Sequence, residues 1–253
     1  MFDGQVILNA GTTYYICTSA DDYNWAWRHD SGGSYPNGEA WRATDNFNWA
    51  PIPGVDMVFE TYMTLVHTKI WDVYDLRDMQ NNLSGNYELM NDIDASETAT
   101  WNGGLGFDPI GNGSNPFTGI FDGDGYVIYH LTINRPGEDN IGLFANLGLT
   151  GQVNNKGMTV TITGNSYVGG VAGSSQGKIG NCSVTGTVSG IQNSVGELVG
   201  WISIQGQVWH SETVGNVAGF DRIGGLVGES SGSIYFSQSA GNVNNAAVVC
   251  GSP

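Results

Sequence analysis

The chain has 253 residues, and 40% of them are apolar, which is enough to bury a core and excludes a chain that is disordered throughout. Asp and Glu number 24 against 8 Lys and Arg, so the net charge of −16 excludes a nucleic-acid groove, because this surface would repel phosphate. The 39 Gly and only 7 Pro are typical of short strands joined by tight turns.

Residues 1–65 predict an incomplete all-β unit. Apolar and polar residues alternate over residues 5–19 and again over residues 55–64, which indicates strands. The segment has room for about four or five strands, fewer than the roughly seven of a stand-alone sandwich. We therefore expect residues 1–65 to form a partial, aromatic-rich β-sandwich.

The aromatic residues of this unit are candidate ligand-binding residues. They stand among Asn, Asp, Gly and Ser, and flat rings beside such polar side chains suit sugars, whose apolar faces stack on the rings. Trp25 and Trp27 share parity on one strand, so both face the same side. The alternative is that this side is the core of the sandwich. The candidates are Trp25, Trp27, Tyr35, Trp41 and Trp49.

Residues 66–84 predict a linker followed by a capping helix. From Ile70 to Leu83 the apolar residues are spaced for one face of a helix, with acids early in the segment. The apolar positions are Trp71, Val73, Leu76, Met79 and Leu83. We expect a helix over residues 71–83 that covers one end of the unit that follows.

Residues 85–253 are periodic. Four blocks align without gaps, residues 151–164, 177–190, 206–219 and 232–245, at spacings of 26, 29 and 26 residues. Val153, Ile179, Val208 and Ile234 form one column, and Ile162, Val188, Val217 and Val243 form another. A repeat this short cannot bury its apolar side alone, so copies must stack. Because Gly and β-branched residues exclude helical repeats, we predict a parallel β-helix of about four to five coils, with residues 126–133 as its first rung.

The blocks are joined by a second Gly-rich element, at Gly170–Gly173, Gly196–Gly200 and Gly225–Gly228. Together with residues 83–94 and 116–123, these elements resemble the Gly-Leu-any-Gly (GLUG) repeat of large bacterial and archaeal surface proteins. The resemblance covers about residues 70–253 and implies a β-helical stalk, adhesive or accessory region without catalytic residues. The unit before it looks like the C-terminal half of an aromatic-rich β-sandwich that precedes such repeats in secreted proteins.

Trp209 and Tyr235 are candidate ligand-binding residues on the solenoid. They occupy one column in adjacent rungs, next to the inward Val208 and Ile234, so we expect them to point outward as a stacked pair. Stacked exposed aromatic residues mark contact with a ligand or partner. A ladder between coils that contributes only stability is the alternative.

Two sets of acidic residues point to chemistry. Glu197 and Glu229 lie on adjacent rungs, and a polysaccharide hydrolase or lyase needs such carboxylates. The alternative is that they are solvated acids of turns. Alternating Asp residues offer hard oxygen ligands for calcium, although such residues are also common in turns. The calcium candidates are Asp92, Asp94, Asp122 and Asp124.

The sequence favours a non-enzymatic role outside the cell. Its four His are isolated, so it lacks the His-Glu-x-x-His zinc site of peptidases that carry this repeat, and we expect no cofactor apart from calcium. The acidic composition favours an extracellular or cell-surface protein whose export signal lies outside this sequence, and no apolar run reaches the roughly 18 to 20 residues that span a bilayer.

Our leading hypothesis is a structural or adhesive segment that binds carbohydrate or a cell-surface protein. The first alternative is the hydrolase or lyase. The second is a filament or sheath subunit that self-associates through the open ends of the solenoid, because unpaired strand edges invite another chain.

Overall fold

The computed structural model describes residues 15–20, 23–28, 39–43, 49–56 and 67–245. The chain divides into two compact units, Met1–Thr64 and Leu65–Pro253, which we describe separately.

The first unit contains an antiparallel sheet of four strands in the order β1-β2-β3-β4. Its strands are β1 (Tyr15–Ala20), β2 (Tyr23–Arg28), β3 (Glu39–Ala43) and β4 (Trp49–Asp56). Of the candidate sugar-binding residues, Trp25 and Trp27 lie on β2, Trp41 on β3 and Trp49 on β4, whereas Tyr35 lies outside the described residues. Of the segments expected to form strands, 5–19 and 55–64, residues 5–14 and 57–64 also lie outside them, so the partial sandwich stays a prediction.

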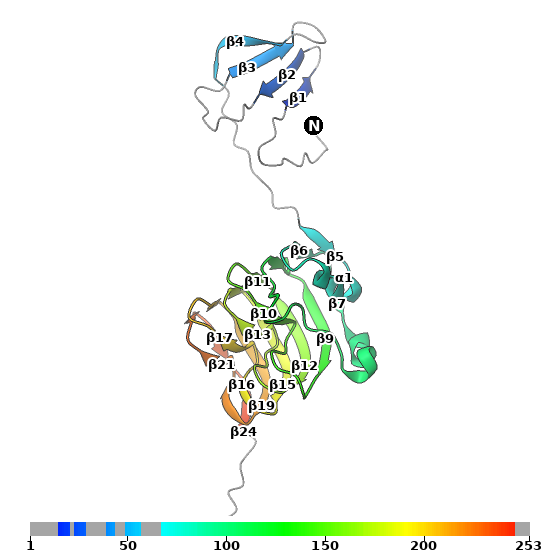
Figure 1. Cartoon of the computed structure of the whole chain (residues 1–253), viewed down its shortest axis with the longest axis vertical. Coiled ribbons are helices and arrows are strands. Elements are labelled where there is room, and N and C mark those ends of the chain that lie inside the picture. Colours follow the sequence, from blue (N-terminus) through cyan, green and yellow to red (C-terminus); the bar gives the residue numbers. More distant parts are fainter. Residues whose placement is uncertain (1–14, 21–22, 29–38, 44–48, 57–66, 246–253) are drawn as a thin grey trace, which may run out of the picture. The chain divides into compact units, whose positions relative to one another are not determined.

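The second unit is a parallel β-solenoid of about four turns, which confirms the predicted fold class (Figure 1). Its first long sheet is formed by β22 (Ser233–Tyr235), β18 (Gln207–Trp209), β14 (Lys178–Gly180), β11 (Gln152–Asn154), β8 (Ile120–Asp122), β6 (Asn86–Leu89) and β5 (Thr68–Ile70). Its second is formed by β23 (Gln238–Ser239), β19 (Glu212–Gly219), β15 (Ser183–Gly190), β12 (Gly157–Gly164), β9 (Val127–Asn134) and β7 (Ile93–Asp94), with β24 (Asn242–Asn245) also paired to β19.

Two shorter parallel sheets complete the later coils. One contains β10 (Phe144–Leu147), β13 (Ala172–Ser175), β17 (Val199–Ile202) and β21 (Val227–Ser230). The other pairs β16 (Asn193–Gly196) with β20 (Asp221–Gly224). A coil with a strand in every sheet, such as residues 178–202, passes through four sheets, and the chain then returns one strand spacing, about 4.8 Å, further along the axis.

The predicted columns are confirmed residue by residue. Val153 pairs with Ile179, Ile179 with Val208, and Val208 with Ile234. Val153, Ile179 and Val208 are at most 1% exposed, whereas Ile234, on the last described coil, is 41% exposed. The stacked β-branched side chains form the dry interior that an isolated repeat cannot make.

A short helix lies at the other end of the solenoid, beside β5 (Figure 1). It consists of α1 (Val73–Asp78) followed by the 3-10 turn η1 (Met79–Asn81), within the predicted span 71–83. Asp72 accepts hydrogen bonds from the backbone N–H groups of Tyr74 and Asp75, which begins the helix, and Val73 and Leu76 are buried. A second 3-10 element, η2 (Ser96–Gly104), follows β7 and is kinked at Trp101–Gly103, whose backbone is not helical. Among the described residues, no helix has the length and apolar character needed to cross a bilayer.

The ladder begins earlier than the predicted first rung at residues 126–133. β5 pairs in parallel with β6, and β6 with β8, so α1 lies within the first coil instead of ahead of the solenoid. These early strands are two to four residues long and are separated by α1 and η2, which hides their periodicity in the sequence.

Non-glycine residues with positive φ stack at two corners of the coils. Tyr167, Ser194 and Arg222, with φ of 57°, 59° and 52°, follow one corner, and Asn181, His210 and Phe236, with φ of 50°, 46° and 48°, follow another. This conformation costs about 1–2 kcal/mol for a residue other than glycine. It turns the chain from one sheet to the next and directs the second set of side chains outward.

Candidate functional site

The predicted pair Trp209 and Tyr235 lies at the second of these corners. The two residues are register partners at the ends of β18 and β22, and Tyr235 is exposed while Trp209 is half-buried. The indole of Trp209 lies over Gly180 on the preceding rung, where any side chain would collide with the ring. Trp209 therefore packs toward Gly180, and the exposed ring of Tyr235 continues the same column.

Two further rings, which the sequence reasoning missed, adjoin this pair. His210 and Phe236 are stacked, with ring centroids 5.2 Å apart and planes at 13°. Phe236 is 83% exposed. Its ring thus gains little from burial. We call Trp209, His210, Tyr235 and Phe236 the aromatic corner.

Two adjoining hollows run from the aromatic corner along the axis of the solenoid. One, of about 390 Å³, is lined by Lys156, Asn181, Cys182, Ser183, His210, Ser211, Glu212, Phe236 and Gln238. The other, also of about 390 Å³, is lined by Asp122, Asp124, Gly125, Asn154, Lys156 and Asn181. We call the two together the polar groove. The register partners from Asp122 to Tyr235 span five rungs, or about 19 Å at the usual strand spacing.

The polar groove offers both hydrogen-bond donors and acceptors. The Asn181 amide donates to Asn154 Oδ1 at 3.1 Å, and the Gln238 amide to Glu212 Oε2 at 3.4 Å. Lys156 is exposed and lines both hollows, so it adds a positive charge where they meet. Aromatic faces at one end and mixed polar side chains along the length suit a ligand that carries many hydroxyl groups.

Three of the four calcium candidates, Asp92, Asp94 and Asp122, accept hydrogen bonds from backbone N–H groups. Asp122 Oδ1 accepts from the Asp124 N–H at 3.0 Å, and Asp92 Oδ1 from the Val127 N–H at 2.9 Å. A hydrogen bond from the Ser96 N–H, with one to His130, lowers the pKa of Asp94. Within residues 67–245 no three His, Cys, Asp or Glu side chains gather as a metal site. Asp122 and Asp124 line the polar groove, and calcium stays a prediction.

Glu197 and Glu229 differ sharply in surroundings. Glu197 has no exposed surface, and neither carboxylate oxygen has a hydrogen-bond partner among the described residues, because the nearby Thr213 hydroxyl donates to the Gly225 carbonyl at 2.9 Å. Burial raises the pKa of Glu197 to about 7. Glu229 accepts from Ser194 and Arg222 at 2.8 and 2.9 Å. A polysaccharide cannot reach a fully buried carboxyl, so this pairing gains no support and the enzyme alternative remains untested.

Comparison with known proteins identifies one sequence motif and two relatives. Residues 164–189 match the family model described as the GLUG motif. The chain carries a GLUG motif. The matched GLUG residues begin at the end of β12 and run through β13 and β14 into β15, so the resemblance inferred from the Gly-rich elements is confirmed.

Two related proteins match a longer stretch of this chain than the GLUG family model does. Halomucin of Haloquadratum walsbyi is 42% identical over 153 residues, which are 57% of this chain and 2% of that protein. A protein of Evansella cellulosilytica named as a Gly-rich membrane protein is 34% identical over 163 residues, which are 61% of this chain and 19% of that protein. The chain thus matches only a small part of each relative's length. No solved structure matches the chain significantly.

Proposed function

We propose that the chain is a structural segment of a cell-surface or secreted protein, in which the β-solenoid serves as a stiff spacer. The continuous interior column supports this role, because each coil is held by its neighbours and the stack resists bending. The GLUG motif and relatives named halomucin and Gly-rich membrane protein favour a place at the cell surface. The net charge of −16 agrees with a surface exposed to solvent.

The polar groove and the aromatic corner give this spacer a binding role, for which we propose a linear polysaccharide. The observation that carries the proposal is the exposed, stacked His210–Phe236 pair at one end of the groove. Sugar faces would stack on these rings and on Tyr235, and hydroxyl groups would meet the amides of Asn181 and Gln238. The groove length of about 19 Å is long enough for several sugar units.

The test is affinity electrophoresis of the full chain in gels that contain neutral or acidic polysaccharides. We expect Phe236→Ala to weaken binding about tenfold, which corresponds to a loss of about 1.4 kcal/mol. Phe220→Ala is the matched control, because Phe220 is also exposed but lines neither hollow, and it should bind as the wild type does. Absence of binding to every polysaccharide, or equal loss in both variants, contradicts the proposal.

The other hypotheses keep their own tests. Sugar release from polysaccharides would support the hydrolase or lyase. Self-association is tested by sedimentation. On the last described coil Ile234 and Val243 are 41% and 49% exposed, so a second copy of the chain would bury apolar surface by packing there. Calcium at Asp122 and Asp124, and sugar binding by the tryptophans of β2, β3 and β4, likewise stay predictions.

A further inference from the structure

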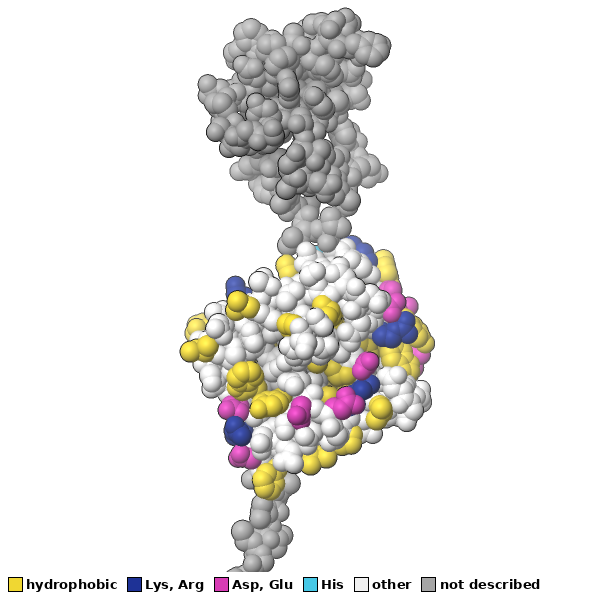
Figure 2. Space-filling view, viewed as in Figure 1, with side chains coloured by type: hydrophobic (Ala, Val, Ile, Leu, Met, Phe, Trp, Pro, Cys, Tyr) yellow, Lys and Arg dark blue, Asp and Glu magenta, His cyan; other side chains and the backbone are white. Residues whose placement is uncertain are grey.

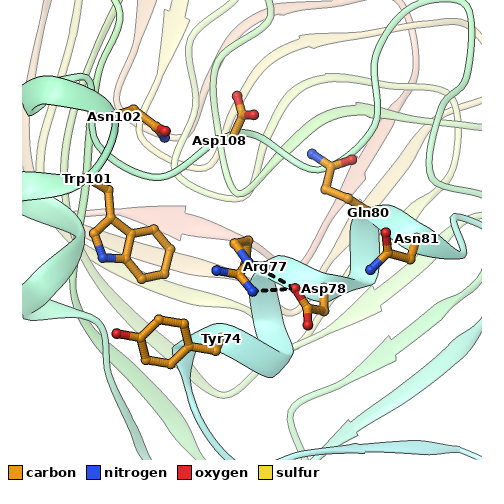
Figure 3. Close-up of a pocket in the computed structure, with 8 residues that line it drawn as sticks. All are labelled: Tyr74, Arg77, Asp78, Gln80, Asn81, Trp101, Asn102 and Asp108. Atoms are coloured by element: carbon orange, nitrogen blue, oxygen red, sulfur yellow. Dashed lines mark hydrogen bonds and ion pairs between the residues drawn. The ribbon is translucent and has the colours of Figure 1, made fainter.

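A separate hollow lies at the opposite end of the solenoid, between α1–η1 and η2 (Figure 3). It has a volume of about 440 Å³, within the range of small-molecule sites. It is lined by Tyr74, Arg77, Asp78, Gln80, Asn81, Trp101, Asn102 and Asp108. We propose that this hollow, which we call the end hollow, binds a single neutral sugar ring at the terminus of a glycan.

The aromatic wall of the end hollow is held rigidly. The rings of Tyr74 and Trp101 lie 5.4 Å apart, and Trp101 stacks on the fully buried Phe107 with centroids 6.1 Å apart. The Tyr74 hydroxyl donates to Glu97 Oε2 at 2.6 Å, which fixes the phenol ring. Rigid aromatic side chains lose little conformational entropy when a ligand stacks on them.

The polar wall is also fixed before any ligand arrives. Gln80 donates to the Pro109 carbonyl at 2.6 Å and accepts from the Gly111 N–H at 3.0 Å, so its amide ties η1 to the loop that follows η2. The Asn102 amide nitrogen donates to the Gly106 carbonyl at 2.8 Å, and its side-chain oxygen, which has no donor among the described residues, could accept a bond from a ligand. Asn81 is exposed at the rim and offers a second amide. Donors and acceptors therefore surround the aromatic wall.

Charge in the end hollow is balanced, which favours a neutral ligand. Arg77 donates to Asp78 Oδ1 through Nε at 2.9 Å and Nη2 at 2.7 Å, and its guanidinium carbon lies 5.4 Å from the Tyr74 ring centroid and 6.0 Å from that of Trp101. Asp108 pairs with Arg135 at 3.0 Å. An anion would have to compete with Asp78, and a cation with the two arginines. A hydroxyl group needs only the remaining donors and acceptors.

The size of the end hollow separates it from the polar groove. The groove spans about 19 Å over five rungs and suits a chain, whereas the end hollow is one space bounded by two short helical elements. Tyr74, which is 45% exposed, offers an aromatic ring against which one sugar ring would pack. The two sites share no residue, so they can be tested independently.

The experiment is saturation-transfer NMR on the full chain with a panel of neutral methyl glycosides, including hexoses and N-acetylhexosamines. We expect transfer to at least one glycoside, with at least tenfold weaker binding by Tyr74→Ala and Arg77→Ala. Trp71→Ala is the matched control, because Trp71 is 57% exposed at the same end of the solenoid but does not line the hollow. This variant should bind the glycoside as the wild type does. Thermal unfolding of every variant verifies that the fold is retained.

Phe236→Ala separates this proposal from the polysaccharide proposal, because it removes the most exposed ring of the aromatic corner and leaves the end hollow intact. Normal glycoside binding by this variant supports the end hollow even if no polysaccharide binds. Absence of transfer to all neutral glycosides, a preference for anionic sugars, or loss in Phe236→Ala but not in Tyr74→Ala overturns the proposal.

Discussion

Replacement of Glu197 by Gln should stabilise the solenoid at neutral and alkaline pH. Glu197 stands where neighbouring coils have Gly170 and Gly225, and its side chain occupies space left by Gly215. It is fully buried without a hydrogen-bond partner among the described residues, so its charged form is strongly disfavoured. Burial raises its pKa from 4.5 to about 7.

The sign and size follow from linkage between protonation and folding. The folded state holds the proton more tightly than the unfolded state, so this contribution to stability is complete below about pH 4.5 and is lost as the pH rises past about 7. At about 1.4 kcal/mol per pH unit, the loss amounts to about 3 kcal/mol. Gln cannot ionise, so Glu197→Gln removes this pH dependence.

Urea unfolding at pH 4.5, 6 and 8 tests this reasoning. Wild type and Glu197→Gln should have similar midpoints at pH 4.5, and the variant should be more stable by about 3 kcal/mol at pH 8. Glu212→Gln is the control, because Glu212 is exposed and its loss should leave the pH dependence unchanged. If Glu197→Gln keeps the wild-type pH dependence, Glu197 is not a buried neutral acid.

Three further predictions concern the coils and the surface. Ile179→Ala, which opens a cavity in the interior column, should lower the free energy of unfolding by about 2–5 kcal/mol, whereas the same change at the exposed Ile204 should cost under about 1 kcal/mol in urea titrations. Gly186→Ala should lower the free energy of unfolding by about 2 kcal/mol or more, because Gly186 has a φ of 143° and a side chain there would collide with the Val160 carbonyl. The same change at Gly137, which has open space around it, should be tolerated. Raising NaCl from 0.1 to 1 M should raise the midpoint of thermal unfolding. The salt shortens the screening length from about 10 to about 3 Å and so weakens the repulsion within a chain of net charge −16. A lower midpoint at 1 M NaCl would contradict this.

The periodic half of the fold could be predicted because stacking repeats side chains as well as backbone. Val153, Ile179 and Val208 must fill the same interior position on successive rungs, so their similarity is visible in the sequence. The first coil could not be predicted this way, because α1 and η2 interrupt strands of two to four residues. Charged side chains on the face shown in Figure 2 lie in small groups and form no continuous stripe.

The candidate sites could be predicted only in part. Tyr235 could be predicted from its column in the aligned repeats. The outward turn at His210 and Phe236 could not, because it depends on a backbone conformation that residue type does not reveal. The repeat of an aromatic pair, Trp209-His210 and Tyr235-Phe236, at one register was the available signal. Burial of Glu197 contradicts the usual exposure of acids, and only its place in a glycine column indicated it.

The end hollow left no signal in the sequence. Tyr74 and Arg77 lie on α1, and Trp101 lies on η2 more than twenty residues later, so their meeting depends on how both elements pack on the first coil. Two aromatic residues and an arginine at that separation are ordinary in any sequence. Only the structure brings them together (Figure 3).

Disulfide trapping across adjacent rungs tests the stacked coils most directly. Thr161 and Thr187 are exposed register partners on β12 and β15. Their Cα atoms should lie about 4.8 Å apart, within disulfide range. The double variant Thr161→Cys with Thr187→Cys, in a chain whose Cys17, Cys182 and Cys250 are replaced by Ser, should cross-link on mild oxidation. Thr161→Cys with Ser183→Cys, displaced about 13 Å along the strand, should not. Equal cross-linking of both pairs, or none in the first, would contradict the stacked solenoid.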